Sequence, residues 1–325
     1  MRVVVTGGAG FIGSHLIEAL VARGDTVTCI ERLGAPRSWI AGLPLTFAPV
    51  GLDDVAKLTR LLDGADVVYH LAGLTDATAP ADYYAVNTEG TARVLRAAAA
   101  LPSPPRVLLL SSLAAVGPNR DDGPLDSDTV PYPLSHYGHS KLLAEQLVHA
   151  YADRVPATIL RLPSVYGPRE RGVLKFFQLV SRGVALTVGG WNRQATFLYV
   201  LDTVQGLLAA ASAPRAEGRT YCLGHPQPVS WKEFAAATGR ALGRRPHLVS
   251  VPAPVAWGIA AGSELCAFLR RSSAILNREK MREITQRRWV CDPSRAMAEL
   301  GFDPRYDIDR GVLATAQWYQ AAGWV

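Results

Sequence analysis

Two side chains in the run YGHSK, Tyr137 and Lys141, have the types and the spacing for proton transfer. On a helix they would project from one face, because residues four apart are neighbours there. A tyrosine is normally a poor acid or base at neutral pH, with a pKa of about 10. A nearby ammonium group favours the phenolate, so such a pair can exchange a proton with a hydroxyl group. In isolation, the same spacing is more often a solvated helix face.

A pair of serines supports the interpretation that Tyr137 and Lys141 transfer protons. The apolar run at 106–111 reads as a buried strand and ends in Ser111 and Ser112. Parallel α/β proteins bind their ligands at the carboxyl ends of such strands. The hydroxyl of Ser112 could hydrogen-bond a reacting oxygen there and orient it toward Tyr137. The alternative is that both serines only cap the strand, and for Ser111 we favour that alternative.

The N-terminal run TGGAGFIG, residues 6–13, follows an expected strand and opens an expected helix. In this context Gly7 allows a tight turn, Gly10 lets the backbone approach phosphate groups, and Gly13 lets the helix pack on the strand. The N–H groups and the dipole of the helix N-terminus favour an anion. The run therefore predicts a pyrophosphate site, although its GxxGxxG spacing differs from the GxGxxG of ordinary dehydrogenases.

Glu31 stands at the end of the second expected strand, about twenty residues after the glycines. A carboxylate there would accept hydrogen bonds from the adenosine ribose and would repel a 2′-phosphate, which favours NAD over NADP. Arg32 and Arg37 leave NADP open, because arginines can clamp a phosphate.

The elements that must position these residues alternate along the first half of the chain, which predicts βαβ units and a parallel sheet covered by helices on both faces. Expected strands lie at 2–6, 26–30, 67–71, 106–111 and 157–162, and expected helices at 13–23, 55–62, 83–100 and 137–151. The fold class is therefore α/β, a Rossmann-type doubly wound parallel sheet.

After Pro163 the regular alternation stops, and Gly-, Pro- and Trp-rich loops surround one helix near 201–211 and one strand near 220–223. We therefore expect two domains. The dinucleotide-binding domain would comprise 1–163 plus 199–223, and a smaller C-terminal substrate-binding lobe would comprise 164–198 plus 224–325.

Several runs together resemble the extended short-chain dehydrogenase/reductase family, over nearly the whole chain. They are TGGAGFIG, HLAG at 70–73, VNTEGTARVL, SSLAAVGP at 111–118, YGHSK, and LRLPSVYGP at 160–168. The resemblance implies that Ser112, Tyr137 and Lys141 are catalytic and that Asn87 supports them. It also implies a cofactor site formed by Gly7, Gly10, Phe11, Ile12, Gly13, Glu31, Arg32, Leu52, Leu71, Ala72, Gly73, Tyr137, Lys141 and Pro163.

Departures from the family's patterns indicate which of its members this chain resembles. Dehydratases of this family carry an acidic pair where this chain has Leu113 and Ala114, so a dehydratase is not expected. Residues that sugar-nucleotide epimerases use on the diphosphate are replaced by Val116, Ser164 and Ala195, although Arg193 lies close enough in sequence to substitute. We therefore assign Ser112, Ser164 and Arg193 to the substrate. SSLAAVGP and the tail WVCDPSRAMAELGF are similar to 3β-hydroxysteroid dehydrogenases and their bacterial relatives.

Composition excludes other classes. The net charge of +6 is spread along the chain without basic runs, so a nucleic-acid partner is not expected. The four cysteines lack metal-ligand spacing, which predicts reduced thiols, no metal and a cytoplasmic protein. Because Met1 and Arg2 lead directly into the first expected strand, we do not expect a secreted protein. The apolar stretch 251–269 is too interrupted for a membrane span, and would either contact a membrane surface or pack in the small lobe.

These patterns predict an NAD-linked oxidoreductase that interconverts a secondary alcohol and a ketone on a small hydrophobic or amphipathic molecule, with NADP possible as cofactor. The nearest alternative is an NDP-sugar 4-epimerase that retains NAD, and a non-catalytic nucleotide-binding protein is the remaining one. We also expect a homodimer through the helices that carry Asn87 and Tyr137, with Leu142, Leu143 and Leu147 available for that contact.

Overall fold

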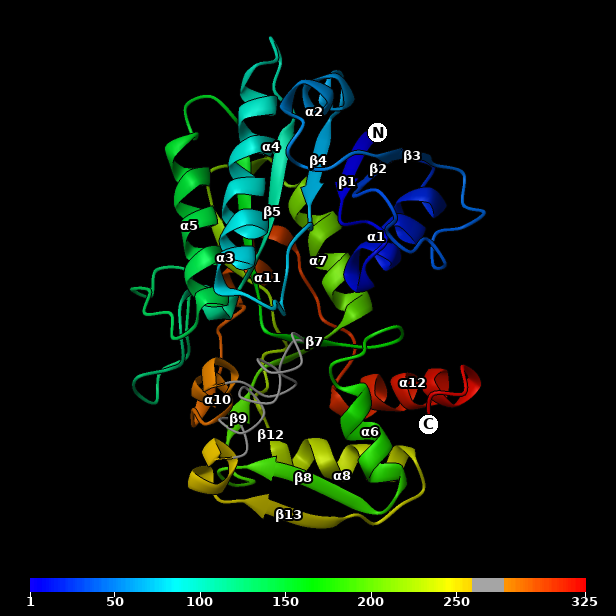
Figure 1. Ribbon diagram of the computed structural model, residues 1–325, viewed down its shortest axis with the longest axis vertical. Coiled ribbons are helices and arrows are strands. Elements are labelled where there is room, and N and C mark those ends of the chain that lie inside the picture. Colours follow the sequence, from blue (N-terminus) through cyan, green and yellow to red (C-terminus); the bar gives the residue numbers. More distant parts are fainter. Residues whose placement is uncertain (259–277) are drawn as a thin grey trace.

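The computed structural model describes residues 1–258 and 278–325, and its centre is a seven-stranded sheet (Figure 1). Every neighbouring pair of strands is parallel. The order is β11 (Thr220–Cys222), β6 (Ala157–Leu162), β5 (Arg106–Ser112), β4 (Val67–His70), β1 (Arg2–Thr6), β2 (Thr26–Glu31) and β3 (Thr46–Pro49). The order reverses between β1 and β4, which is the switch point where doubly wound sheets bind ligands.

Helices cover both faces of this sheet because its strands are apolar on both sides. On one face, α1 (Phe11–Ala22) and α7 (Val200–Ser212) pack over Val3 and Val5. On the other face, α2 (Val55–Leu62), α4 (Gly90–Ala99) and α5 (His136–Ala150) pack over Val4 and its neighbours. The predicted Rossmann-type α/β class is confirmed.

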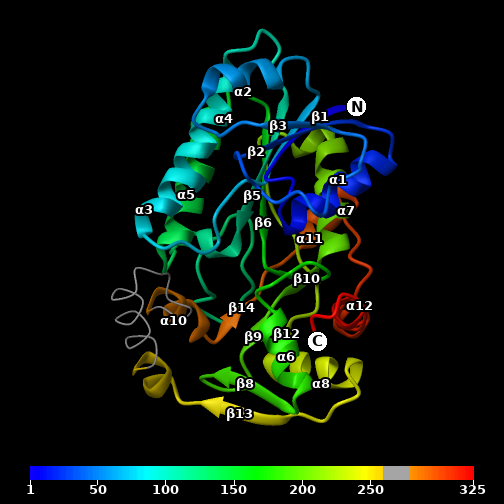
Figure 2. The same cartoon turned by 45° about the vertical axis from the view of Figure 1, so that its right-hand side comes forward.

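A smaller lobe lies beyond the carboxyl ends of the central strands (Figures 1 and 2). Its core is aromatic, and the rings of Phe197 and Phe234 stack 4.8 Å apart. Its elements are β7 (Ser164–Tyr166), α6 (Leu174–Ser181), β8 (Val184–Val188), β9 (Gln194–Ala195), β10 (Phe197–Tyr199), β12 (Val229–Ser230), α8 (Trp231–Ala241), β13 (His247–Val251), α10 (Arg278–Ile284), β14 (Arg288–Trp289) and α12 (Ile308–Ala321). The helix α11 (Ser294–Leu300) returns to the central sheet and packs beside α7 through Ala296 and Leu300.

The expected first-half elements all form, with two differences. The helix expected at 83–100 is divided into α3 (Pro80–Tyr83), a π-helical turn η1 (Tyr84–Glu89) and α4. The four-residue edge strand β3, which ends in Pro49, was not expected. After Pro163 only the helix near 201–211 and the strand near 220–223 were expected, so the helices and short strands of the smaller lobe were not predicted. Those strands are too brief to show a period. The division into two domains at the stated boundaries stays a prediction.

Most of the apolar stretch 251–269 lies outside the described residues, and so does Cys266. In the described ranges, no helix has the length and apolar character needed to cross a membrane. Across the same ranges, His, Cys, Asp and Glu side chains do not form groups of three or more that could hold a metal ion.

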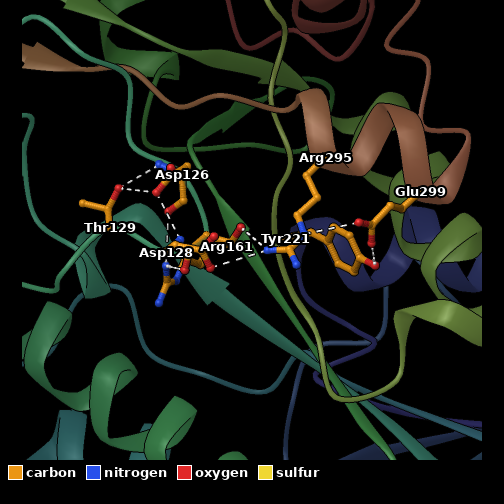
Figure 3. A network of polar contacts seen from close by, with 8 residues as sticks. Asp126, Asp128, Thr129, Arg161, Tyr221, Arg295 and Glu299 are labelled. Atoms are coloured by element: carbon orange, nitrogen blue, oxygen red, sulfur yellow. Dashed lines mark hydrogen bonds and ion pairs between the residues drawn. The ribbon is translucent and has the colours of Figure 1, made fainter.

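A buried ion pair joins α5 to β6. The Arg161 guanidinium lies 2.8 Å from a Glu145 carboxylate oxygen, and both side chains are at most 6% exposed. Arg161 also donates to the backbone carbonyls of Asp126 and Ser127, at 3.4 and 3.0 Å. Figure 3 shows this arginine beside the 126–129 turn, with Arg295 nearby. The pair therefore ties the sheet, α5 and this loop together.

We predict that Glu145→Gln lowers the free energy of unfolding by about 3–5 kcal/mol, because it leaves the buried guanidinium without its counter-charge. Urea denaturation measures the loss. The control is Asp309→Asn, which breaks the exposed Arg240–Asp309 pair and should cost less than about 1 kcal/mol. Equal losses in the two variants would show that burial does not increase the contribution of the Glu145–Arg161 pair to stability.

Candidate active site

The helix α5, which carries Tyr137 and Lys141, closely approaches the segment that follows β5. A Cβ atom on Gly138 would lie 2.3 Å from the carbonyl oxygen of Ala114, so glycine is required at this contact. The approach brings the Tyr137 side chain, at the start of α5, into a hydrogen bond with the Ser112 side chain, at the end of β5. The structure thus brings together the two hydroxyl groups that were predicted to act on one substrate oxygen.

Lys141 lies one turn further along α5 and is 6% exposed. Its Nζ atom donates to the Leu110 carbonyl at 2.8 Å. Burial lowers the pKa of Lys141 to about 8, against the opposing effect of the Glu145 carboxylate. Ser111 donates to the same carboxylate at 2.5 Å, so it orients Glu145 and does more than cap the strand.

The Tyr137 phenol is held in its protonated form. Burial raises the pKa of Tyr137 to about 12, and the charge of Glu283 and the neighbouring Tyr83 add to the increase. The hydrogen bond with Ser112 lowers this pKa. A phenol with this pKa donates a proton readily only to a developing alkoxide, and it gives up its proton at neutral pH only with further positive charge beside it.

Asn87 belongs to the π-helical turn η1 and is 1% exposed. Its side chain accepts from the Leu74 N–H at 2.8 Å and donates to the Leu74 carbonyl at 3.0 Å. It also donates to the Ser140 hydroxyl at 2.9 Å. Asn87 therefore fixes the loop after β4 against α5, and π-helical turns recur at functional sites.

The glycine turn and the loop after β4 fit against each other. Gly7 has φ +73°, and a Cβ there would lie 2.6 Å from the Ala72 backbone nitrogen. A Cβ on Gly13 would lie 2.2 Å from the Gly7 carbonyl oxygen. Gly10 precedes the first residue of α1, whose N–H groups face this turn. This cradle, bare of side chains beside a helix N-terminus, fits a dinucleotide pyrophosphate.

Glu31 ends β2 next to this cradle, and its carboxylate accepts from the Ala9 N–H at 2.8 Å. Burial raises the pKa of Glu31, and that hydrogen bond opposes the increase. Arg32 is exposed, whereas Arg37 stacks on the Phe47 ring with its guanidinium carbon 4.4 Å from the ring centre.

The other predicted cofactor residues lie around the same strand ends. Phe11 and Ile12 begin α1 and are partly buried, and Leu71 and Gly73 belong to the loop after β4. Leu52 packs against Gly90 at the start of α4. Pro163 separates β6 from β7.

The three residues predicted to bind the substrate lie in different surroundings. Ser112 lies in the site, and Ser164 is exposed at the start of β7, directly after Pro163. Arg193 is 9% exposed and donates to the Thr187 hydroxyl at 2.8 Å and to the Gly190 carbonyl at 3.1 Å. Burial lowers the pKa of Arg193. These contacts tie Arg193 to its own lobe, and its role toward a substrate stays a prediction.

The helix α10 also lies beside Tyr137, which was not predicted from the sequence. A small cavity of about 40 Å³ is lined by Tyr137, Tyr83 and Ser135 from one side and by Lys280 and Glu283 of α10 from the other, with Thr75 and Asp76 completing it. Nothing near Glu283 in the sequence marks it as a site residue, because its neighbours in space are remote along the chain.

The model of the NAD dependent epimerase/dehydratase family matches residues 3–224. The chain belongs to this family. In the epimerase/dehydratase family, curated relatives include a ceramide reductase of Caulobacter vibrioides, 29% identical over 99% of this chain and 96% of that protein. A 3β-hydroxysteroid dehydrogenase/Δ5→4-isomerase of Mycobacterium tuberculosis is 25% identical over 98% and 90%. UDP-sugar epimerases and a UDP-sugar decarboxylase also match.

Solved structures share the fold. MoeE5, crystallised with UDP-glucuronic acid and NAD, superposes with a TM-score of 0.79 at 26% identity, covering 99% of this chain and all of that one. Together with the fitting cradle, membership of the epimerase/dehydratase family establishes NAD as the cofactor. The predicted family and cofactor are therefore confirmed.

We predict that Gly138→Ala lowers kcat by about 10²-fold, because the added Cβ would force α5 away from Ala114 and separate Tyr137 from Ser112. Steady-state kinetics measure the change, with circular dichroism as a check of folding. His139→Ala, at the exposed neighbouring position of the same helix, should leave kcat unchanged. Wild-type kcat in Gly138→Ala would mean that the close approach is not needed for chemistry.

Proposed function

We propose that this protein is an NAD(P)-dependent oxidoreductase that interconverts a secondary alcohol and a ketone on a hydrophobic or amphipathic small molecule. The observation that carries the proposal is the convergence of Ser112, Tyr137 and Lys141 beside the dinucleotide cradle. Likeness to a ceramide reductase over nearly the full length of both chains, and to a steroid dehydrogenase, supports the class of substrate.

In the proposed reaction, the bound nicotinamide supplies the acceptor or donor of the hydride. Ser112 hydrogen-bonds the substrate oxygen and turns it toward Tyr137. Tyr137 donates a proton to that oxygen during ketone reduction, or removes one during alcohol oxidation. Lys141 would support the phenolate by its charge and would hold the cofactor ribose, while Asn87 fixes the loop after β4 against α5.

The cofactor residues are proposed by position. Gly7, Gly10 and Gly13 would hold the pyrophosphate with Phe11 and Ile12, and Glu31 would accept hydrogen bonds from the adenosine ribose. Arg32 and Leu52 would flank the adenosine. Leu71, Ala72, Gly73 and Pro163 would border the nicotinamide half.

We predict that Tyr137→Phe lowers kcat by about 10²–10⁴-fold while NAD still binds, because the variant lacks the proton that general acid catalysis requires. The measurement is nicotinamide absorbance during turnover of long-chain ketones and alcohols, with NADH binding followed by fluorescence. The exposed Tyr132→Phe is the control and should retain activity. Full activity in Tyr137→Phe would reject the proposed acid.

A UDP-sugar 4-epimerase is the second candidate, favoured by the solved neighbours that hold UDP-sugars. The buried Arg193 could serve a diphosphate if it exchanged its contacts with Thr187 and Gly190. The same absorbance assay separates the candidates. An oxidoreductase changes the amount of NADH as its substrate is consumed, whereas an epimerase converts a UDP-sugar to its isomer and returns NAD unchanged.

We predict that Glu31→Ser shifts the ratio of NADP to NAD affinity by at least about tenfold toward NADP, because it removes the charge that repels a 2′-phosphate while Arg32 remains. Fluorescence titration with NADH and NADPH gives both constants. Asp53→Ser, an exposed acid outside the turn, should leave the ratio unchanged. An unchanged ratio in Glu31→Ser would place the adenosine ribose elsewhere.

The remaining parts of the proposal concern the protein's setting. We infer a cytoplasmic homodimer that associates through α4 and α5. Leu143 on α5 is 39% exposed and supports this face.

A further inference from the structure

A carboxylate from the smaller lobe lies at the start of α5, the helix that carries Tyr137. Ser135, the residue before α5, accepts from the Gly138 N–H at 2.9 Å and so caps the helix. The same hydroxyl donates to the Glu283 carboxylate of α10. Figures 1 and 2 show α10 below the central sheet, next to the end of α5 that begins at residue 136. One hydroxyl group thus connects the smaller lobe to the first turn of the helix that carries Tyr137.

This contact places a carboxylate near the N-terminus of α5. The first turn of α5, residues 136–139 of the described chain, contains no acidic residue. A carboxylate near a helix N-terminus is stabilised by the N–H groups and by the helix dipole. Glu283 takes this position from outside the helix, and the Trp289 indole N–H donates to its backbone carbonyl at 3.1 Å. Both contacts help to fix the position of Glu283.

We propose that Glu283 is a positioning residue that holds the first turn of α5 in place and keeps Tyr137 protonated, so that the site is set for proton donation to a ketone. The proposal rests on the proposed acid/base role of Tyr137. It makes α10 part of the machinery that tunes the reaction. It does not alter the equilibrium of the reaction, but it sets the pH at which each direction runs fastest.

The charges around Tyr137 decide the sign of this effect. The groups that line the same cavity are Tyr83 on α3, Asp76 in the loop before α3, and Lys280 and Glu283 on α10, while Lys141 lies one turn further along α5. His136 contacts the Tyr84 hydroxyl at 2.8 Å. The two lysines favour the phenolate and the carboxylates oppose it. Glu283 is the carboxylate whose charge raises the pKa of Tyr137.

The test follows the Tyr137 phenol directly and needs no substrate. The full-length protein is labelled with 3-fluorotyrosine, which lowers phenol pKa values into a tolerated pH range, and is titrated by fluorine NMR with saturating NAD⁺. Comparison with Tyr137→Phe assigns the resonance. In Glu283→Gln we expect the Tyr137 pKa to fall by about 0.5–1 unit, because a negative charge has been removed. Glu299→Gln, a carboxylate of α11 bonded to Tyr221, is the control and should not move it.

A second pair of variants protects the test against misfolding of Glu283→Gln. Ser135→Ala keeps the carboxylate but removes the hydroxyl that holds it, and should lower the Tyr137 pKa in the same direction. Ser135→Thr retains the hydroxyl and should restore the wild-type value. An unchanged Tyr137 pKa in both Glu283→Gln and Ser135→Ala overturns the proposal.

The kinetic readout separates this inference from the proposed function. If the protein oxidises and reduces a substrate, Glu283→Gln should move the alkaline limb of ketone reduction and the acidic limb of alcohol oxidation to lower pH by the same amount. If neither limb of the pH profiles moves in Glu283→Gln, the proposed role of Glu283 is wrong, and Tyr137 can still be the acid. Full activity in Tyr137→Phe overturns the proposed function itself.

Discussion

The arrangement of the site depends on one close contact, the approach of α5 to the segment that follows β5. Because Gly138 has no side chain, the helix lies against the Ala114 carbonyl, and the residues on either side of the contact meet. Tyr137 reaches Ser112 only across this contact, and Lys141 reaches the end of β5 one turn later. The buried Glu145–Arg161 pair then fixes the same helix to β6. A loss of contact at Gly138 would therefore disturb several interactions together.

Electrostatics in the site follow from burial. Lys141 and Tyr137 both lie where water is scarce, so each is pushed toward its neutral form. The carboxylates of Glu145 and Glu283 act in the same direction on the two groups, since each favours the protonated state. A neutral phenol beside a lysine that retains part of its charge suits the delivery of a proton to an oxygen that gains negative charge.

Sequence reasoning located the parts of the site that depend on short segments. The glycine turn, the Tyr137 and Lys141 spacing and the Ser112 strand end each lie within one βα unit, so local pattern determines them. The parallel sheet with helices on both faces also followed, because strands and helices alternate along the first half of the chain. Glu283 could not be found in this way, since a seven-residue helix brings it from a distant part of the chain. The π-helical turn at Asn87 and the short strands around the aromatic core likewise depend on tertiary packing.

The position of β11 has a consequence for synthesis of the chain. Among the strands that the structure describes, β11 pairs with β6 alone, and the chain forms β7, α6, β8, β9, β10 and α7 between them. On the ribosome, β6 would therefore emerge and dock on β5 with its outer edge unpaired, while the intervening segments were still being made. An unpaired edge is open to pairing with another chain. β6 is covered only when residues 220–222 have left the exit tunnel, and the three-residue β11 then forms the edge of the sheet. The longer edge of β6 is therefore open to other chains while the intervening segments are being made.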